Sequence, residues 1–138
     1  MTRWALLAAG VLGVTGVAMG AFAAHGLEGW LERQSIDPLA VEKRIEQCEV
    51  AVRYHLLHAL AVLSVGLSGW CRASLSRMAL LLWSLGIVFF SGGLYSMVFF
   101  DAMGHWAIVP SGGLCLILGW ASIALLGIFP GPKGASEV

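Results

Sequence analysis

The sequence predicts an all-α integral membrane protein: a bundle of four transmembrane helices, with an amphipathic helical extension before the second span. Of its 138 residues, 59% are hydrophobic and only 12% are charged, and the mean hydropathy is +0.85. A soluble domain of this length cannot bury so much apolar surface. The apolar residues also gather in four long stretches, each near the roughly 20 helical residues that cross a hydrocarbon core.

The four predicted spans cover residues 4–24, 52–70, 78–100 and 107–129 of a single membrane domain, 1–138. In lipid, every backbone N–H and C=O group must find a partner within the chain. Long apolar runs meet that demand as helices, whereas barrel strands alternate apolar and polar residues. In this scheme residues 25–51 form the first loop, and residues 130–138 form a flexible tail.

The first span has a second interpretation. Arg3, the apolar run and Ala21-Phe22-Ala23 resemble the charged end, apolar middle and cleavage box of a secretory signal. The run is long for a signal, however, and it contains Gly16 and Gly20 at a spacing typical of helix contacts. We therefore expect a retained transmembrane helix, and an intact mass beginning at Ala24 would contradict this prediction.

The distribution of charge predicts the orientation. The N-terminus, second loop and tail carry Arg3, Arg72, Arg77 and Lys133, with Glu137 as the only acid among them. The first loop and the start of the second span carry the other basic residues, Arg33, Lys43, Arg44 and Arg53. These are interspersed with six acids, and the third loop adds Asp101. Short, purely basic connections normally stay in the cytoplasm, so both termini are expected there.

Asp37 and Pro38 predict a helix that begins before the second span. Asp37 can accept hydrogen bonds from free N–H groups of the first turn, where Pro is tolerated. We expect this helix to run into the second span, either continuously or with a bend at the interface. One polar stripe on it consists of Glu42, Glu46, Glu49 and Arg53. Glu49 precedes Arg53 in the favourable order for an ion pair. We interpret the stripe as a solvated or headgroup-facing surface; a docking surface for a partner is the alternative.

Polar side chains gather on a different face of the same helix. They are Gln47, Tyr54, His55 and His58, and they should face the bundle interior, water or the interface rather than lipid. His25, at the end of the first span, should lie on the same side of the membrane. We expect these groups, with Arg53, to form interhelical hydrogen bonds or an interfacial network. The alternatives are a metal or haem site built from the three imidazoles, and a role in proton or solute handling.

Small residues predict how the helices pack, because helix association in lipid depends on close backbone approach. The first span offers Gly16 and Gly20, the third repeats Ala79, Gly86 and Gly93 every seven positions, and the fourth opens with Gly112 and Gly113. Packing is the expected role of all of these. The alternative for the stretches 91–93 and 111–113 is irregular backbone lining a small cavity, as in transporters with broken helices.

The motifs of common catalytic sites are absent from the sequence. It contains no phosphate-binding glycine loop, no nucleophile elbow and no Cys-x-x-Cys metal knuckle, and its spans contain no acidic residue. A formal net charge of zero gives no electrostatic reason to expect nucleic acid as a partner. We therefore predict no enzymatic activity, no catalytic residues and no cofactor. The expected partners are the lipid bilayer and either other proteins or further copies of the chain.

Several motifs resemble, in order, the signatures of the YgdD-type small inner-membrane proteins. They lie at residues 20–27 (GAFAAHGL), 51–60 (AVRYHLLHAL), 90–95 (FSGGLY) and 110–113 (PSGG), followed by Gly119-Trp120. The resemblance implies a four-span, multi-pass inner-membrane protein of a family classed by a domain of unknown function. His25, Arg53, Tyr54, His55 and His58 coincide with these motifs.

The chain departs from that family's pattern in three respects. Gly93 stands where relatives often have Ser, Ser111 stands where they often have Ile or Val, and the first loop is somewhat long. The resemblance supplies no catalytic residue. From the sequence we predict a structural protein or an accessory to a membrane complex. The alternatives are a small-solute or ion transporter or channel, and a metal- or haem-binding protein using His25, His55 and His58.

Overall fold

The computed structural model of the chain describes residues 3–68, 70, 73–101 and 107–129. Its elements are α1 (Arg3–His25), α2 (Leu27–Glu32), α3 (Pro38–Leu67), α4 (Ser74–Gly86), the π-helical η2 (Ile87–Ser91), α5 (Gly92–Phe100) and α6 (Ile108–Ile128). Within these residues there is no strand. In the described part of the chain, four helices are long and apolar enough to cross a membrane: α1, α3, the continuous stretch Ser74–Phe100, and α6. The all-α, four-span prediction is confirmed.

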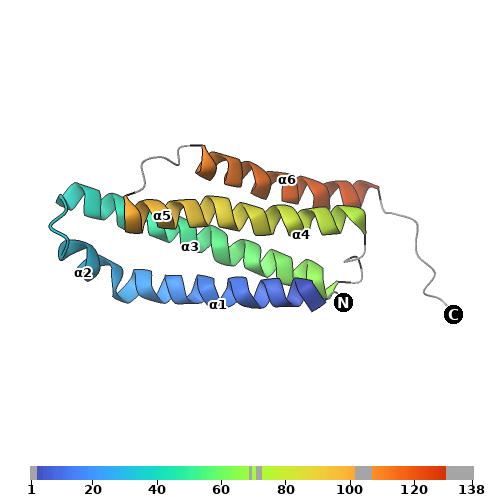
Figure 1. The fold of residues 1–138 in the computed structure, drawn as a ribbon. Coiled ribbons are helices and arrows are strands. Elements are labelled where there is room, and N and C mark those ends of the chain that lie inside the picture. Colours follow the sequence, from blue (N-terminus) through green and yellow to red (C-terminus); the bar gives the residue numbers. More distant parts are fainter. Residues whose placement is uncertain (1–2, 69, 71–72, 102–106, 130–138) are drawn as a thin grey trace.

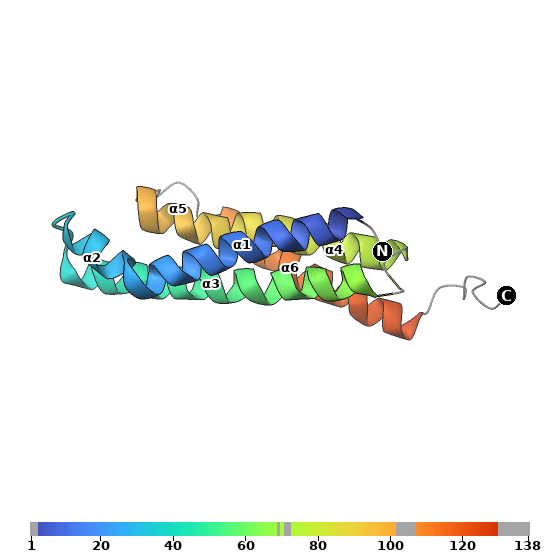
Figure 2. The ribbon, with the colours of Figure 1, turned by 90° about the horizontal axis from the view of Figure 1, so that it is seen from below.

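The spans form two helical hairpins that pack side by side. In the first hairpin α1 runs along α3, and in the second α6 runs along α4 and η2. Helix α3 faces the third span, so α1 and α6 lie on opposite outer sides of the stack (Figures 1 and 2). The start of α1, the end of α3, the start of α4 and the end of α6 all lie at one end of the molecule (Figure 1). The predicted tail 130–138 lies outside the described residues.

Close glycine contacts join the helices of the first hairpin. A Cβ atom added at Gly16 would lie 2.7 Å from Cδ2 of Leu56, and one added at Gly20 would lie 3.2 Å from Cγ1 of Val52. Such distances are too short or very tight for real Cβ contacts, so the small residues allow α1 to approach α3 closely.

Glycines play the same part in the second hairpin. Gly86 faces Leu116, and a Cβ atom at Gly93 would lie 2.8 Å from Cγ2 of Val109, so both small residues of the third span abut α6. Gly112 of α6 lies against the backbone of η2. The neighbouring Gly113 differs, because a Cβ atom there would make only ordinary contacts, at 3.6 Å and beyond.

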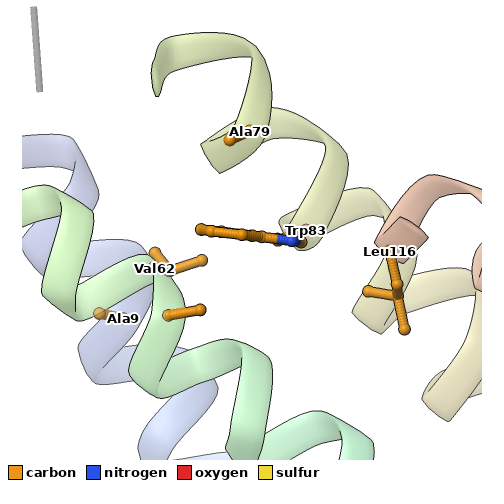
Figure 3. Packing of buried hydrophobic residues seen from close by; sticks show 6 residues of the cluster. Ala9, Val62, Ala79, Trp83 and Leu116 are labelled. Atoms are coloured by element: carbon orange, nitrogen blue, oxygen red, sulfur yellow. The ribbon is translucent and has the colours of Figure 1, made fainter. Parts of the chain in front are cut away.

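The apolar core between the hairpins is built around Trp83. This side chain is 1% exposed and belongs to a buried cluster with Ala9, Val62, Ala79 and Leu116. Its ring lies between Val62 on α3 and Leu116 on α6 (Figure 3). One aromatic side chain thus packs against both hairpins.

The third span is interrupted by one π-helical turn, η2, where the N–H of Gly92 bonds to the carbonyl of Ile87, five residues earlier. Two tertiary contacts accompany it: the buried Ser91 hydroxyl donates to the Ala51 carbonyl of α3 at 2.9 Å, and Gly112 lies against the backbone of η2 from the other side. We attribute the bulge to these contacts. The irregular backbone considered for residues 91–93 therefore exists, but it is packed on both sides, and residues 111–113 are regular α-helix.

The first loop folds into a small second core at the opposite end of the molecule from the N-terminus. Asp37 accepts a hydrogen bond from the N–H of Leu39 at 3.1 Å, and α3 runs unbroken from Pro38, as predicted. The short helix α2 was not predicted. It forms because Leu27 and Leu31 are completely buried, in a cluster with Cys48 of α3 and Val98 of α5.

An ion pair ties this second core to the third span. The guanidinium of Arg44 lies 2.7 Å from the carboxylate of Asp101, and its other terminal nitrogen donates to the Val98 carbonyl at 3.4 Å. Arg44 therefore pairs with the C-cap residue that follows α5, and it also donates to a backbone carbonyl in the last turn of that helix. The predicted pair between Glu49 and Arg53 does not form, and both side chains are exposed.

Candidate functional site

The structure divides the polar residues singled out from the sequence into two sets. His55 and His58 are buried, at 5% and 2% exposed, one turn apart on α3. Arg53, Tyr54 and His25 are exposed. His25 ends α1, about 15 Å along the axis from Thr15, which is the α1 residue that contacts His55. The two buried imidazoles form the candidate site, and His25 is not part of it.

The hydrogen bonds of His58 fix its tautomer. Its Nε2 accepts from the indole N–H of Trp120 at 3.1 Å, and its Nδ1 lies 2.8 Å from the Tyr54 carbonyl. An indole can only donate and a carbonyl can only accept. The imidazole must therefore be neutral with its proton on Nδ1, and neither ring nitrogen is free.

His55 links three helices through longer contacts. Its Nε2 lies 3.4 Å from the Thr15 hydroxyl on α1, and its Nδ1 lies 3.4 Å from the Tyr95 hydroxyl on α5. Thr15 already donates to the Val11 carbonyl at 2.9 Å, so its oxygen is left to accept. The consistent arrangement places the proton of His55 on Nε2, with the Tyr95 hydroxyl donating to Nδ1. These distances are near the upper limit for hydrogen bonds, so this linkage is weaker than that of His58.

Aromatic rings enclose His58. Trp83 and Trp120 lie with their centroids 4.8 Å apart, and both rings are within 6.4 Å of the imidazole centroid. Tyr54 stacks on His58 at 6.0 Å and contacts Phe90 at 4.9 Å. The rings exclude lipid from the imidazole and supply one hydrogen-bond donor, which is an environment suited to a neutral, fixed histidine.

This geometry limits the chemistry of the site. A metal ion needs a free nitrogen lone pair, and His58 has none. No group of three or more His, Cys, Asp and Glu side chains lies close enough to hold a metal among the residues that the structure describes. What the two imidazoles do is join helices: His58 connects α3 to α6, and His55 connects α3 to α1 and α5.

Sequence reasoning missed the partners of the histidines. Thr15, Tyr95 and Trp120 were not singled out as site residues, although each is a polar or amphipathic side chain inside an apolar span, which is a usable signal. Each lies at least 40 positions in sequence from the histidine that it contacts, and this separation hides the pairing. Gln47, which was expected in the cluster, makes no side-chain hydrogen bond with the described residues.

Known proteins of one family are similar to this chain over most of its length. Residues 19–113 match the family model described as "Protein of unknown function (DUF423)". The chain belongs to the DUF423 family. No solved structure matches this one.

Named relatives of this DUF423 chain are membrane proteins. It is 36% identical to a UPF0382 membrane protein of Haemophilus influenzae over 108 residues, covering 78% of this chain and 80% of that protein. It is 32% identical to the UPF0382 inner membrane protein YgdD of Escherichia coli, over 99% of this chain and 98% of YgdD. The relative YwdK of Bacillus subtilis is 31% identical, over 81% of this chain and 85% of YwdK. The predicted family resemblance is confirmed, and the chain is a membrane protein of a family whose function is unknown.

The DUF423 match covers only part of the candidate site. It includes His55, His58 and Tyr95, but Thr15 and Trp120 lie outside it. Neither the family description nor the relatives' names state an enzymatic activity.

Proposed function

We propose that this DUF423 protein is a non-catalytic structural component of a membrane assembly, or an accessory to one, in the inner membrane with both termini in the cytoplasm. The observation that carries this proposal is the pairing of the buried polar groups. Both nitrogens of His58 and both nitrogens of His55 face partners inside the bundle. Polar groups used in this way hold spans together and leave little for binding or transport.

The second support is the polar surface of the α3 extension. Glu42, Glu46, Glu49 and Arg53 are all exposed, on the stretch of α3 whose other residues pack into the second core. Because α3 is unbroken from Pro38, this stripe is held rigidly relative to the spans. A rigid charged face next to the membrane can contact a partner protein without losing conformational entropy on binding.

The orientation rests on charge and on the hairpin geometry. The end of the molecule with the start of α1 and the start of α4 carries Arg3 and Arg77, without a described acid beside them. At the other end Arg44 is neutralised by Asp101. This asymmetry favours the first end as cytoplasmic. An alkaline phosphatase fused after Val138 should be inactive, and an active fusion would reverse the orientation.

The geometry disfavours the two rival functions. A transporter would need His55 and His58 to border a hydrated pocket, yet both are buried and paired with groups of the bundle. A haem or metal protein would need His25 near the pair, and His25 lies about 15 Å along the axis of α1 from the Thr15 contact.

The first test is metal analysis with an absorption spectrum, on protein purified gently in detergent, for the wild type and the variant His55→Ala/His58→Ala. We expect no stoichiometric metal or haem in either protein and a lower stability in the variant. Stoichiometric metal or haem that disappears in the variant would overturn the proposal.

The second test is photo-crosslinking in cells, with a benzophenone amino acid placed at Glu46 in the exposed stripe. The control position is Leu60, which is exposed on the same helix within the membrane span. We expect a discrete protein adduct from Glu46 and none from Leu60, and an adduct of twice the chain's mass would identify the partner as a second copy. The absence of any discrete adduct at Glu46 would contradict an accessory role for this face.

A further inference from the structure

A pocket of about 270 Å³ opens between the two hairpins, next to the end of α3 and the start of α4. This is the end of the molecule at which α1 begins (Figure 1). The pocket's apolar walls come from Val65 on α3 and from Ile123, Leu126 and Gly127 on α6. Its polar lining comes from Ser68, Trp70 and Ser76. It therefore lies at one membrane boundary, with apolar walls on the span side and polar groups on the side of the loop.

Ser76 is the unusual member of this lining. It is completely buried, and its hydroxyl has no hydrogen-bond partner among the described residues. The other serine of the pocket, Ser68, donates to the Val65 carbonyl at 2.8 Å. A buried hydroxyl without a partner is costly, so Ser76 would gain a hydrogen bond from a polar group bound in this pocket.

The start of α4 adds positive potential beside the same pocket. Helix α4 begins at Ser74, and no side chain caps its first turn. Ser76 belongs to this turn, whose backbone N–H groups therefore have no capping partner. The dipole of a helix favours negative charge at this end, and the exposed Arg77 follows directly.

We propose that this pocket binds one anionic phospholipid from the leaflet on the side of the two termini. One acyl chain lies along the apolar wall of Val65, Ile123 and Leu126, and an ester or glycerol oxygen of the lipid accepts a hydrogen bond from Ser76. The phosphate lies at the first turn of α4, beside Arg77. The pocket's combination of an apolar wall, a buried donor and a helix N-terminus matches the three parts of such a lipid in order.

Gly127 provides a variant that blocks the pocket without disturbing the fold. A Cβ atom added there meets no atom within 4 Å, although Gly127 lines the pocket. Gly127→Leu should therefore fill the space meant for the acyl chain. Gly13→Leu is the matched control, because a Cβ atom at Gly13 also meets nothing within 4 Å and Gly13 does not line this pocket.

Ser76→Ala tests the hydrogen bond separately. Loss of one neutral hydrogen bond should weaken lipid binding about fivefold. Its control is Ser84→Ala on the same helix, since Ser84 donates to the Leu80 carbonyl of its own helix at 2.8 Å.

The experiment is native mass spectrometry of the full chain in detergent, titrated with palmitoyl-oleoyl phosphatidylglycerol, with the phosphatidylcholine analogue, or with inorganic phosphate. We expect one tightly bound phosphatidylglycerol on the wild type and on the two controls, with weaker binding of phosphatidylcholine. Binding should be lost in Gly127→Leu and weakened about fivefold in Ser76→Ala, while thermal melting shows that both variants are folded.

Three outcomes would overturn the proposal. The first is equal lipid binding by Gly127→Leu and Gly13→Leu, which would place the lipid elsewhere. The second is a wild type that holds no discrete lipid. The third is inorganic phosphate that binds as tightly as the lipid, because the apolar wall would then contribute nothing.

Discussion

Replacing Gly112 or its neighbour Gly113 with alanine should affect stability very differently, although both lie in α6. A Cβ atom at Gly112 would lie 2.8 Å from the carbonyl carbon of Phe89 and from Cα of Phe90, both backbone atoms of η2. At Gly113 the nearest atom would be the Phe90 side chain, at 3.6 Å. The first contact cannot be relieved by a side-chain rotation, whereas the second is an ordinary one.

The magnitude follows from overpacking. Forcing an extra carbon into a packed site costs about 1–3 kcal/mol. Alanine is favoured over glycine within a helix by up to about 1 kcal/mol, but this gain applies to both positions and cancels in the comparison. Gly112→Ala should therefore be less stable than Gly113→Ala by about 1–3 kcal/mol, and Gly113→Ala should be at least as stable as the wild type.

The assay is unfolding in mixed micelles with rising fractions of sodium dodecyl sulfate, followed by circular dichroism and tryptophan fluorescence. The free energy of unfolding is compared between the two variants in the same detergent. Equal values, or a larger loss at Gly113, would refute the close packing of α6 on η2.

Two further predictions concern single hydrogen bonds and use the same assay. Trp120→Phe removes the indole N–H that donates to His58 and should lower the free energy of unfolding by about 1 kcal/mol. The control Trp4→Phe, at a highly exposed position, should change it little. Equal losses in the two variants would contradict the tautomer assigned to His58. Ser91→Ala removes the bond to α3 and should cost about 1 kcal/mol, whereas Ser96→Ala, which loses a bond within its own helix, should be nearly neutral. A larger loss for Ser96→Ala would contradict the role given to the π-helical turn.

Features set by neighbouring residues were predictable from the sequence. The spans followed from the length of apolar runs, and the start of α3 followed from Asp37 and Pro38, whose capping contact is made within two residues. The burial of Gly86 and Gly93 followed from their seven-residue spacing. In each case the sequence signal lies within the segment itself.

Features set by distant residues were not predictable in this way. Helix α2 forms because Leu27 and Leu31 meet Val98, which lies on another span. Arg44 pairs with Asp101, which is 57 positions later in the sequence, whereas the local pair of Glu49 and Arg53 does not form. The π-helical turn likewise depends on contacts from two other helices, and no local sequence motif predicts it.

The candidate site was half predictable for the same reason. The cost of polar groups in lipid indicated that His55 and His58 face inward, and both are buried. The helical positions alone could not show that the two rings, three residues apart, join different neighbours. They also could not separate His25 from the pair, since only the packing of α1 on α3 sets its level.

The two-hairpin architecture has a consequence for how the chain is synthesised and inserted. The tight contacts of Gly16 and Gly20 lie within the first hairpin, so it can close before the second hairpin has left the ribosome. His55 and His58 then sit in the membrane with one side unpaired until Tyr95 and Trp120 arrive. Pairing of these imidazoles is therefore a late step of biogenesis, and an arrested chain ending before α5 would expose them to membrane quality control.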